Sequence, residues 1–245
     1  MSAHSKNTID SAESPAARRS DAGQIRLQPR DVDGLLFTAS MYAVPYDLLA
    51  ARLRVNEARF RAVAARWRAA GLVSTGSLSE GLPWCWLTPA GMRHTGYPWE
   101  ADRPPLGRLA HIRAAAAVRL WMEGDRAWKM HGAQWRCERE LRAERPGVGQ
   151  PGHVADAEIL WPSVPGSPRA GETWAVEVEL TPKALARVQR IMTGLLSQQY
   201  SQVMYACAPA AAPVVQRAAA SLGKDQAARL IVRELPPAAA MPKAA

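Results

Sequence analysis

The sequence predicts an α+β fold in two parts, and three features of the residue pattern lead to this prediction. Residues 29–100 contain three helical patterns and then two short apolar runs around a Gly/Ser turn. Residues 106–235 alternate helical and strand-like patterns, which is typical of a small α/β domain with a mixed sheet. Between them, the Pro-rich stretch 96–107 has the composition of a linker.

The first part begins with three helices whose ends carry clear signals. Pro29 opens the first helix and Pro45 the second, since proline fits the first turn of a helix. Asn56 is placed to cap the third helix and Gly71 to end it. The two apolar runs then predict a β-hairpin, followed by a short helix. Three helices and a hairpin are the elements of a winged helix-turn-helix domain, which we place at 29–100.

The second part is expected to alternate helices and strands. A helix at 105–124 comes first, and a mixed segment at 127–144 combines a short strand with a helical turn. A long helix at 182–200 has Thr181 as its N-cap and Pro182 at its first position. The other expected elements are strands at 154–161, 173–180, 202–208 and 228–235 and a helix at 212–223.

The composition favours an anionic partner. The chain carries 31 Lys and Arg against 22 Asp and Glu, a net charge of +9, which points to nucleic acid first. The richness in Arg, Ala and Pro also fits a GC-rich genome, which raises the arginine content without a functional cause. Both explanations stay open at the level of composition.

The cysteines, the apolar runs and the chain ends indicate where the protein works. Three cysteines lie far apart without a CxxC pair, so neither a zinc site nor a disulfide framework is supported and a reducing cytoplasm is favoured. No signal core and no apolar run of about 18 residues is present, so we expect a cytoplasmic protein with no membrane partner. Residues 1–28 predict a disordered tail and residues 236–245 a flexible one.

The third helix is the candidate DNA-reading element. With Phe60 facing the core, the opposite side of the helix holds only small alanines, and arginines lie on both edges of that alanine face. A low ridge with basic edges suits a major groove, where arginines reach phosphates or guanine edges. The expected DNA-binding residues are Asn56, Arg59, Arg61, Arg66 and Arg68. The alternative is an ordinary solvated face of an Ala/Arg-rich helix.

The strand at 173–180 carries two glutamates on one side. Side chains alternate along a strand, so Trp174 and Val176 face one way while Glu177 and Glu179 face the other, about 7 Å apart. Two like charges at that separation need water, a cation or a metal between them. The strand therefore predicts either a wet outer face or a positive group beside the glutamates.

Further charged residues flank this strand and suggest a catalytic cluster. Asp156 begins the preceding strand and can lie beside Glu177 if the two strands pair. Carboxylate oxygens hold Mg²⁺ or Mn²⁺, and a lysine stabilises the charge that develops on phosphate. We expect Asp156 and Glu177 to be the metal ligands. The candidate catalytic residues are Glu138 (or Glu140), Asp156, Glu177, Glu179 and Lys183.

This order of acidic residues resembles the PD-(D/E)xK nuclease superfamily. Glu138, Asp156 and Glu177 match its carboxylates, while Glu179 stands where the motif has its lysine. By this resemblance Lys183, at the start of the following helix, is the candidate to supply the missing charge; the alternative is a first-turn lysine that packs over the sheet. The histidines fit no metal spacing, and His111, between apolar neighbours, is expected to be a core or capping residue.

Over residues 29–235 the chain also resembles the replication-relaxation family of plasmids and integrative elements. The resemblance is carried in order by "RDVDGLLF", "RFRAVAARWRAAGLV", "PWCWLTPAGM", "LAHIRAAAAVRL", "WRCERELR", "VADAEI" and "AVEVELTPKALARVQRIM". The family implies a winged-helix half that binds double-stranded DNA and a nuclease-like half. It also implies a role in replication or transfer of mobile DNA, with replication or transfer proteins as partners.

Three functions follow from these patterns. The first is a DNA-binding protein of a mobile element, capable of forming oligomers, whose second domain is either a divergent metal-dependent nuclease or a degenerate one used for DNA contact. The second is a winged-helix transcriptional regulator whose second domain only dimerises or binds an effector. The third is a structural replication accessory that recruits partners.

Overall fold

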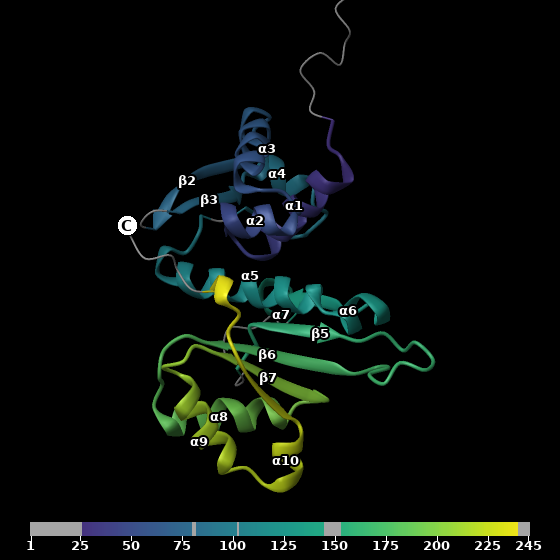
Figure 1. Ribbon diagram of the computed structural model, residues 1–245, viewed down its shortest axis with the longest axis vertical. Coiled ribbons are helices and arrows are strands. Elements are labelled where there is room, and N and C mark those ends of the chain that lie inside the picture. Colours follow the sequence, from purple (N-terminus) through teal and green to yellow (C-terminus); the bar gives the residue numbers. More distant parts are fainter. Residues whose placement is uncertain (1–25, 80–81, 102, 145–152, 240–245) are drawn as a thin grey trace, which may run out of the picture.

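The computed structural model describes residues 26–79, 82–101, 103–144 and 153–239. Most of the tail predicted at 1–28, the last residues of the tail predicted at 236–245 and the tip of the hairpin lie outside the described residues. The fold is mixed α and β, as predicted, with one three-stranded and one five-stranded sheet in the described chain. The two parts lie one above the other with helix α5 (Leu109–Gly124) between them (Figure 1).

The first part has the predicted order of three helices and a hairpin. Its helices are α1 (Pro29–Ser40), α2 (Tyr46–Arg52), α3 (Glu57–Ala69) and the short α4 (Pro89–Arg93). Its strands are β1 (Val44–Pro45), β2 (Val73–Ser79) and β3 (Leu82–Leu87), in the antiparallel order β1-β3-β2. The Asn56 side chain accepts a hydrogen bond from the Arg59 amide at 2.8 Å, and Gly71 follows α3 with a φ of 70°, so both predicted helix ends are confirmed.

The second part is built around the five-stranded sheet. Its strands are β4 (Gln134–Cys137), β5 (Ala157–Leu160), β6 (Thr173–Glu179), β7 (Gln202–Cys207) and β8 (Leu230–Glu234). Its helices after α5 are α6 (Arg126–His131), α7 (Glu138–Ala143), α8 (Leu185–Leu196), α9 (Ala212–Ala220) and α10 (Lys224–Ala228). The sheet order is β4-β5-β6-β7-β8, antiparallel from β4 to β6 and parallel from β6 to β8. The predicted mixed sheet is confirmed.

Two apolar layers cover the sheet. One face packs against α5, and the buried residues of this layer continue into α1, α2 and α3 as one core. The other face packs against α8 and α9 around Met192, Leu195 and Val215. Because the first layer runs through both parts, the parts are joined by apolar packing as well as by the chain.

Buried arginines also connect the two parts. Arg113 on α5 is 3% exposed and donates to the Asp47 carboxylate of α2 at 2.9 Å. Arg139 on α7 donates to the carbonyl oxygens of Ala39 and Glu100 at 3.2 and 2.8 Å. The Pro-rich stretch predicted as a linker thus connects parts that are in direct contact.

Two predicted boundaries differ in the structure. Helix α8 begins at Leu185 with Ala184 as its N-cap, so the prediction of Thr181 as N-cap and Pro182 as first residue is wrong. In the segment before α8, Thr181 forms a bend, residues 182–184 have no regular structure, and Lys183 forms an ion pair with the buried Glu179. Within the end predicted to be flexible, Pro237–Ala239 form a 3₁₀ turn and Ala239 is only 4% exposed.

Candidate functional site

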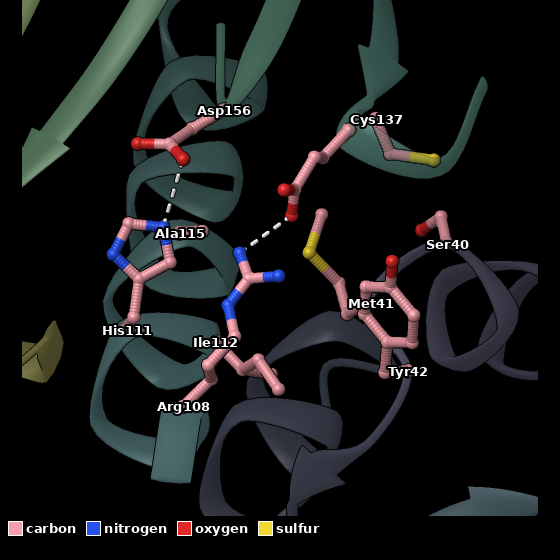
Figure 2. A pocket seen from close by; sticks show the side chains of 10 residues that line it. Ser40, Met41, Tyr42, Arg108, His111, Ile112, Ala115, Cys137 and Asp156 are labelled. Atoms are coloured by element: carbon pink, nitrogen blue, oxygen red, sulfur yellow. Dashed lines mark hydrogen bonds and ion pairs between the residues drawn. The ribbon is translucent and has the colours of Figure 1, made fainter. Parts of the chain in front are cut away.

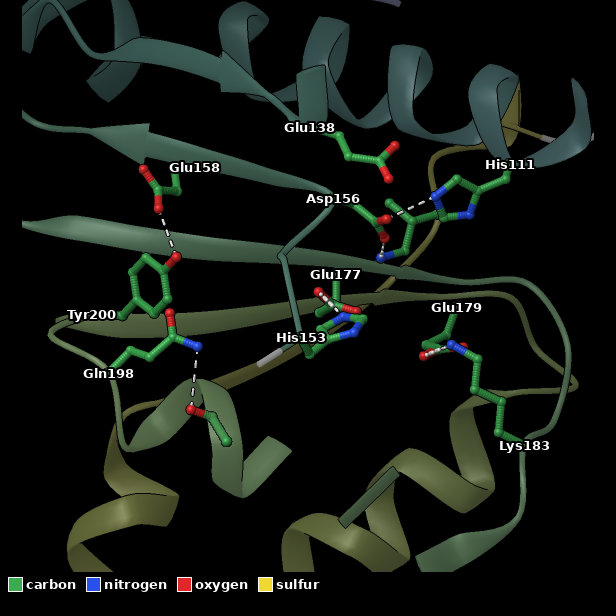
Figure 3. A network of polar contacts seen from close by, with 12 residues as sticks. His111, Glu138, His153, Asp156, Glu158, Glu177, Glu179, Lys183, Gln198 and Tyr200 are labelled. Atoms are coloured by element: carbon green, nitrogen blue, oxygen red, sulfur yellow. Dashed lines mark hydrogen bonds and ion pairs between the residues drawn. The ribbon is translucent and has the colours of Figure 1, made fainter. Parts of the chain in front are cut away.

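Four carboxylates gather where β5 begins and β6 ends (Figure 3). The antiparallel register pairs Ala157 with Val176, which brings Asp156 level with Glu177. Strand alternation turns Trp174 and Val176 into the α5 layer, as predicted. Glu177 and Glu179 point to the α8 side, while Asp156 and Glu138 lie toward α5. The structure thus brings the predicted residues to one end of the sheet, on two sides of it.

The two glutamates of β6 are buried. Glu177 is 1% exposed and Glu179 is 2% exposed. The prediction of a wet outer face is therefore wrong, because both side chains are buried on the face of the sheet against which α8 and α9 pack. A buried carboxylate is costly unless a positive group or hydrogen-bond donors accompany it, and the alternative of a positive group beside each glutamate is the one that the structure contains.

Each of the two glutamates has its own cationic or protonatable partner. The His153 Nε2 lies 2.9 Å from the Glu177 Oε1, and the Lys183 Nζ donates to the Glu179 Oε1 at 2.5 Å. Both partner side chains are about one-third exposed, His153 at 34% and Lys183 at 29%. The glutamates are therefore screened from solvent by side chains that solvent can reach.

Asp156 connects the strand to α5. Its Oδ2 accepts a hydrogen bond from the Val178 amide at 2.8 Å, and its Oδ1 lies 2.9 Å from the His111 Nε2. The amide bond fixes the carboxylate at the end of the sheet, and the His111 ring on α5 reaches it from above (Figure 3). His111 was expected to be a core or capping residue; its ring is one-quarter exposed and lies within hydrogen-bond distance of Asp156.

Glu138 shares a small cavity with Asp156. The cavity is about 20 Å³, enough for one water, and its wall includes Tyr42 from the first part, Arg108 and His111 (Figure 2). The Arg108 guanidinium donates to the Glu138 Oε2 at 2.6 Å. The alternative acid, the carboxylate of Glu140, instead accepts from the Cys137 amide and caps α7. Glu138 is therefore the upstream acid that reaches the site.

The pKa values of Asp156 and Glu177 are shifted in opposite directions. Burial, then the negative charge of Asp156, raises the pKa of Glu177 to about 7, although the His153 hydrogen bond acts against this. Burial also acts to raise the pKa of Asp156, but the hydrogen bond and charge of His111 outweigh it and hold that pKa below its ordinary value. Neighbouring carboxyl groups with pKa values pushed apart are the arrangement in which one stays ionised while the other exchanges a proton near neutral pH.

The two histidines have raised pKa values. Burial acts to lower the pKa of His111, and the Asp156 carboxylate more than compensates. The Glu177 hydrogen bond raises the pKa of His153 against a smaller effect of burial. Sequence reasoning missed both histidines, and the only local signal was the spacing of His153 three positions before Asp156.

Tyr205 is a further group at this end of the sheet. It pairs in register with Glu177 on the neighbouring strand, is fully buried, and its hydroxyl has no hydrogen-bond partner among the described residues. Burial and the charges of Glu177 and Glu179 raise its pKa, so the hydroxyl stays protonated and can donate. Tyr200, in contrast, donates to the buried Glu158 at 2.6 Å in a separate network.

The predicted DNA-reading face lies on α3 and is solvent-exposed. The Phe60 and Trp67 side chains are buried, while the alanines and arginines of the opposite face are exposed, as predicted. The exposed positions are Ala58, Ala62, Ala65, Arg59, Arg61, Arg66 and Arg68. The face thus has the low ridge and basic edges that insertion into a groove requires.

The five predicted DNA-binding residues are not equally available. The side-chain oxygen of Asn56 accepts the capping hydrogen bond from the Arg59 amide. Arg61 donates to Glu57, one turn earlier, at 2.6 Å. Arg66 forms an ion pair with Asp31, which is fully buried. Among the described residues Arg59 and Arg68 form no ion pair, and they are the best placed to contact phosphate.

Comparisons with known proteins leave the family open. No protein-family model, no curated protein and no solved structure matches this chain. The resemblance to the replication-relaxation family therefore stays a prediction. Within the described ranges, no helix is long and apolar enough to cross a membrane, and no three His, Cys, Asp or Glu side chains are grouped to hold a metal ion.

Proposed function

We propose that this protein binds DNA of a plasmid or integrative element and acts in its replication or transfer, with a divergent metal-dependent nuclease core in its second part. The observation that carries the proposal is the burial of Glu177 and Glu179 beside Asp156 at one end of the sheet. Burying like charges together is costly. A fold that needed them only for solubility would leave them in water.

The topology supports the nuclease proposal. Helix α5 precedes an antiparallel run of β4, β5 and β6, and α8 then leads to the parallel strand β7. Asp156 lies immediately before β5, and the Glu177/Glu179 pair lies on β6. With Glu138 on α7, this is the order of acids that the PD-(D/E)xK resemblance predicts.

The donor chemistry fits a divalent cation of the Mg²⁺ or Mn²⁺ type. Mg²⁺ is commonly held by one or two carboxylates and several waters, and Asp156 and Glu177 provide such oxygens at the same end of the sheet, Asp156 from the α5 side and Glu177 from the α8 side. A bound cation would lower the pKa of an attacking water and offset negative charge on phosphate. The absence of a three-residue group among the described residues is compatible with this two-carboxylate arrangement.

The chain's own residues would divide the remaining work. Asp156, held by the Val178 amide, stays ionised and fixed. Glu177, with its pKa near 7, can take or give a proton in exchange with His153. Lys183 places a positive charge at the mouth of the site, and the Tyr205 hydroxyl can donate to an oxygen bound beside the glutamates.

The test is a nicking assay on supercoiled plasmid with Mg²⁺ or Mn²⁺. The wild type should nick the plasmid, and Asp156→Asn and Glu177→Gln should lose at least about 100-fold in rate, since each removes a charge that the chemistry uses. Asp225→Asn, an exposed acid on α10, is the matched control and should retain full activity. Equal nicking by all four proteins would assign the activity to a contaminant and contradict the nuclease proposal.

A winged-helix regulator is the second candidate, and one observation favours it. Every carboxylate of the cluster already has a positive or protonatable partner in the chain. The negative charges are therefore compensated without a metal. A regulator should bind one preferred duplex site with an affinity that Mg²⁺ does not change. Footprinting with and without a chelator separates it from the nuclease.

A further inference from the structure

A second cavity lies on the α5 face of the sheet, over strands β6, β7 and β8. It measures about 180 Å³. Its lining residues are Trp121, Met122, Asp125, Arg169, Trp174, Met204, Ile231 and Arg233. Its lining runs from Trp174, near the start of β6, to Arg233 of β8, which is level with Val178 of β6 through Ala206 of β7. The Trp121 cavity, as we call it, shares no lining residue with the acidic cluster.

The cavity presents an exposed indole. Trp121 on α5 is 43% exposed, although it is large and apolar. Among the described residues, the exposed large hydrophobic side chains are Leu106, Trp121, Met130, Val164 and Leu185, so Trp121 is the one aromatic side chain in that set. A flat aromatic face in water is a stacking platform for a nucleobase, whatever the base.

Two arginines line the same cavity and have no acidic partner among the described residues. The Arg169 guanidinium lies over the Trp161 and Trp174 rings, 4.5 and 4.6 Å from their centroids, which fixes its position. Arg233 is exposed on β8, the edge strand of the sheet.

The acid in the cavity wall, Asp125, forms no ion pair with these arginines. The Asp125 carboxylate accepts from the Ala127 and Trp128 amides at 2.7 and 3.4 Å and caps α6. Both guanidinium groups are therefore available to an anion that enters beside Trp121.

We propose that the Trp121 cavity binds single-stranded nucleic acid, with one base stacked on Trp121 and neighbouring phosphates paired with Arg169 and Arg233. A volume of about 180 Å³ is below the range of roughly 300 to 1,000 Å³ of small-molecule sites. It suits one inserted base with the rest of the strand outside. Bases in a duplex are stacked on each other, so the cavity selects single strands.

The binding of a single strand here goes beyond the proposed function and does not depend on it. A groove reader on α3 contacts duplex, and the acidic cluster acts on a phosphodiester. The Trp121 cavity would hold an unpaired strand against the second part. The three activities rest on different residues and can fail separately.

The experiment is fluorescence anisotropy of a labelled 15-nucleotide DNA, titrated with full-length protein in chelator at low salt. Trp121→Ala should weaken binding about tenfold, since stacking contributes on that scale. Trp121→Phe should retain most of the affinity. Leu106→Ala, which removes an exposed apolar side chain elsewhere, is the matched control and should bind like the wild type.

The role of the arginines is tested by measuring how the affinity for the oligonucleotide depends on salt concentration. Arg233→Gln should reduce the slope of log affinity against log salt by about 0.7, the amount for one phosphate contact on a single strand. Arg217→Gln, an exposed arginine on α9, should leave the slope unchanged. The proposal is overturned if the wild type does not bind the oligonucleotide, if Trp121→Ala matches Leu106→Ala, or if Trp121→Ala weakens duplex equally. Loss of plasmid nicking in Asp156→Asn bears on the acidic cluster alone.

Discussion

Replacing Glu177 by glutamine should change how the stability of the protein depends on pH. The folded protein holds the Glu177 carboxyl at a pKa of about 7 against an ordinary value of 4.5, with burial as the main cause. A raised carboxyl pKa means that the folded state prefers the protonated form. Its contribution to stability is therefore full below about pH 4.5 and is lost as pH rises through about 7.

The magnitude follows from the difference between the two pKa values. The step from 4.5 to about 7 corresponds to about 3 kcal/mol of folding free energy. The raised pKa of His153 acts in the same direction, because a histidine held charged by a partner loses that benefit as pH rises above its folded pKa. Glutamine keeps a hydrogen-bond acceptor for His153 and carries no charge, so it removes both effects.

Urea denaturation of wild type and Glu177→Gln at pH 5, 6, 7 and 8, in chelator, measures the effect. The wild type should lose stability across this window, while the variant should change less and exceed the wild type at pH 8 by up to about 3 kcal/mol. Asp225→Asn should follow the wild-type curve. Parallel curves for wild type and Glu177→Gln would refute the reasoning that Glu177 is held largely protonated by burial.

Three further predictions concern other parts of the molecule. Lys183→Met leaves the Glu179 carboxylate buried and unpaired and should cost about 3 kcal/mol in urea denaturation, most of which Glu179→Gln should restore. Arg59→Ala with Arg68→Ala should weaken duplex binding and lower its salt slope by about 2, while Arg217→Ala should not. Thermal unfolding should show one cooperative transition, because one apolar core runs through both parts; two separated transitions in calorimetry would contradict this.

The order of helices and strands followed from local signals. The α3 cap at Asn56 and its stop at Gly71 are set by a side chain and a backbone angle within one turn of the helix. The alternation along β6 assigned Trp174 and Glu177 to opposite faces, and the structure keeps that assignment. Such features depend on residues a few positions apart, so the sequence displays them directly.

Predictions that depended on distant residues were less successful. The start of α8 was misplaced although its signals are local, since Thr181 and Pro182 precede the helix and Ala184 is its N-cap. The outer face of β6 was expected to be wet as one of two alternatives, and its glutamates are instead buried on the face against which α8 and α9 pack. His111 was assigned to packing, since nothing in its own helix indicates Asp156.

By itself, the sequence determined the basic charge, the two-part order of elements and the face of β6 on which the glutamates lie. Tertiary structure alone decided that those glutamates are buried and which group accompanies each carboxylate. His111 and Asp156 are 45 positions apart, and His153 and Glu177 are 24 apart. Contacts of that separation form only when strands pair and helices pack, and the same packing excludes the water that would otherwise set the pKa values of these groups.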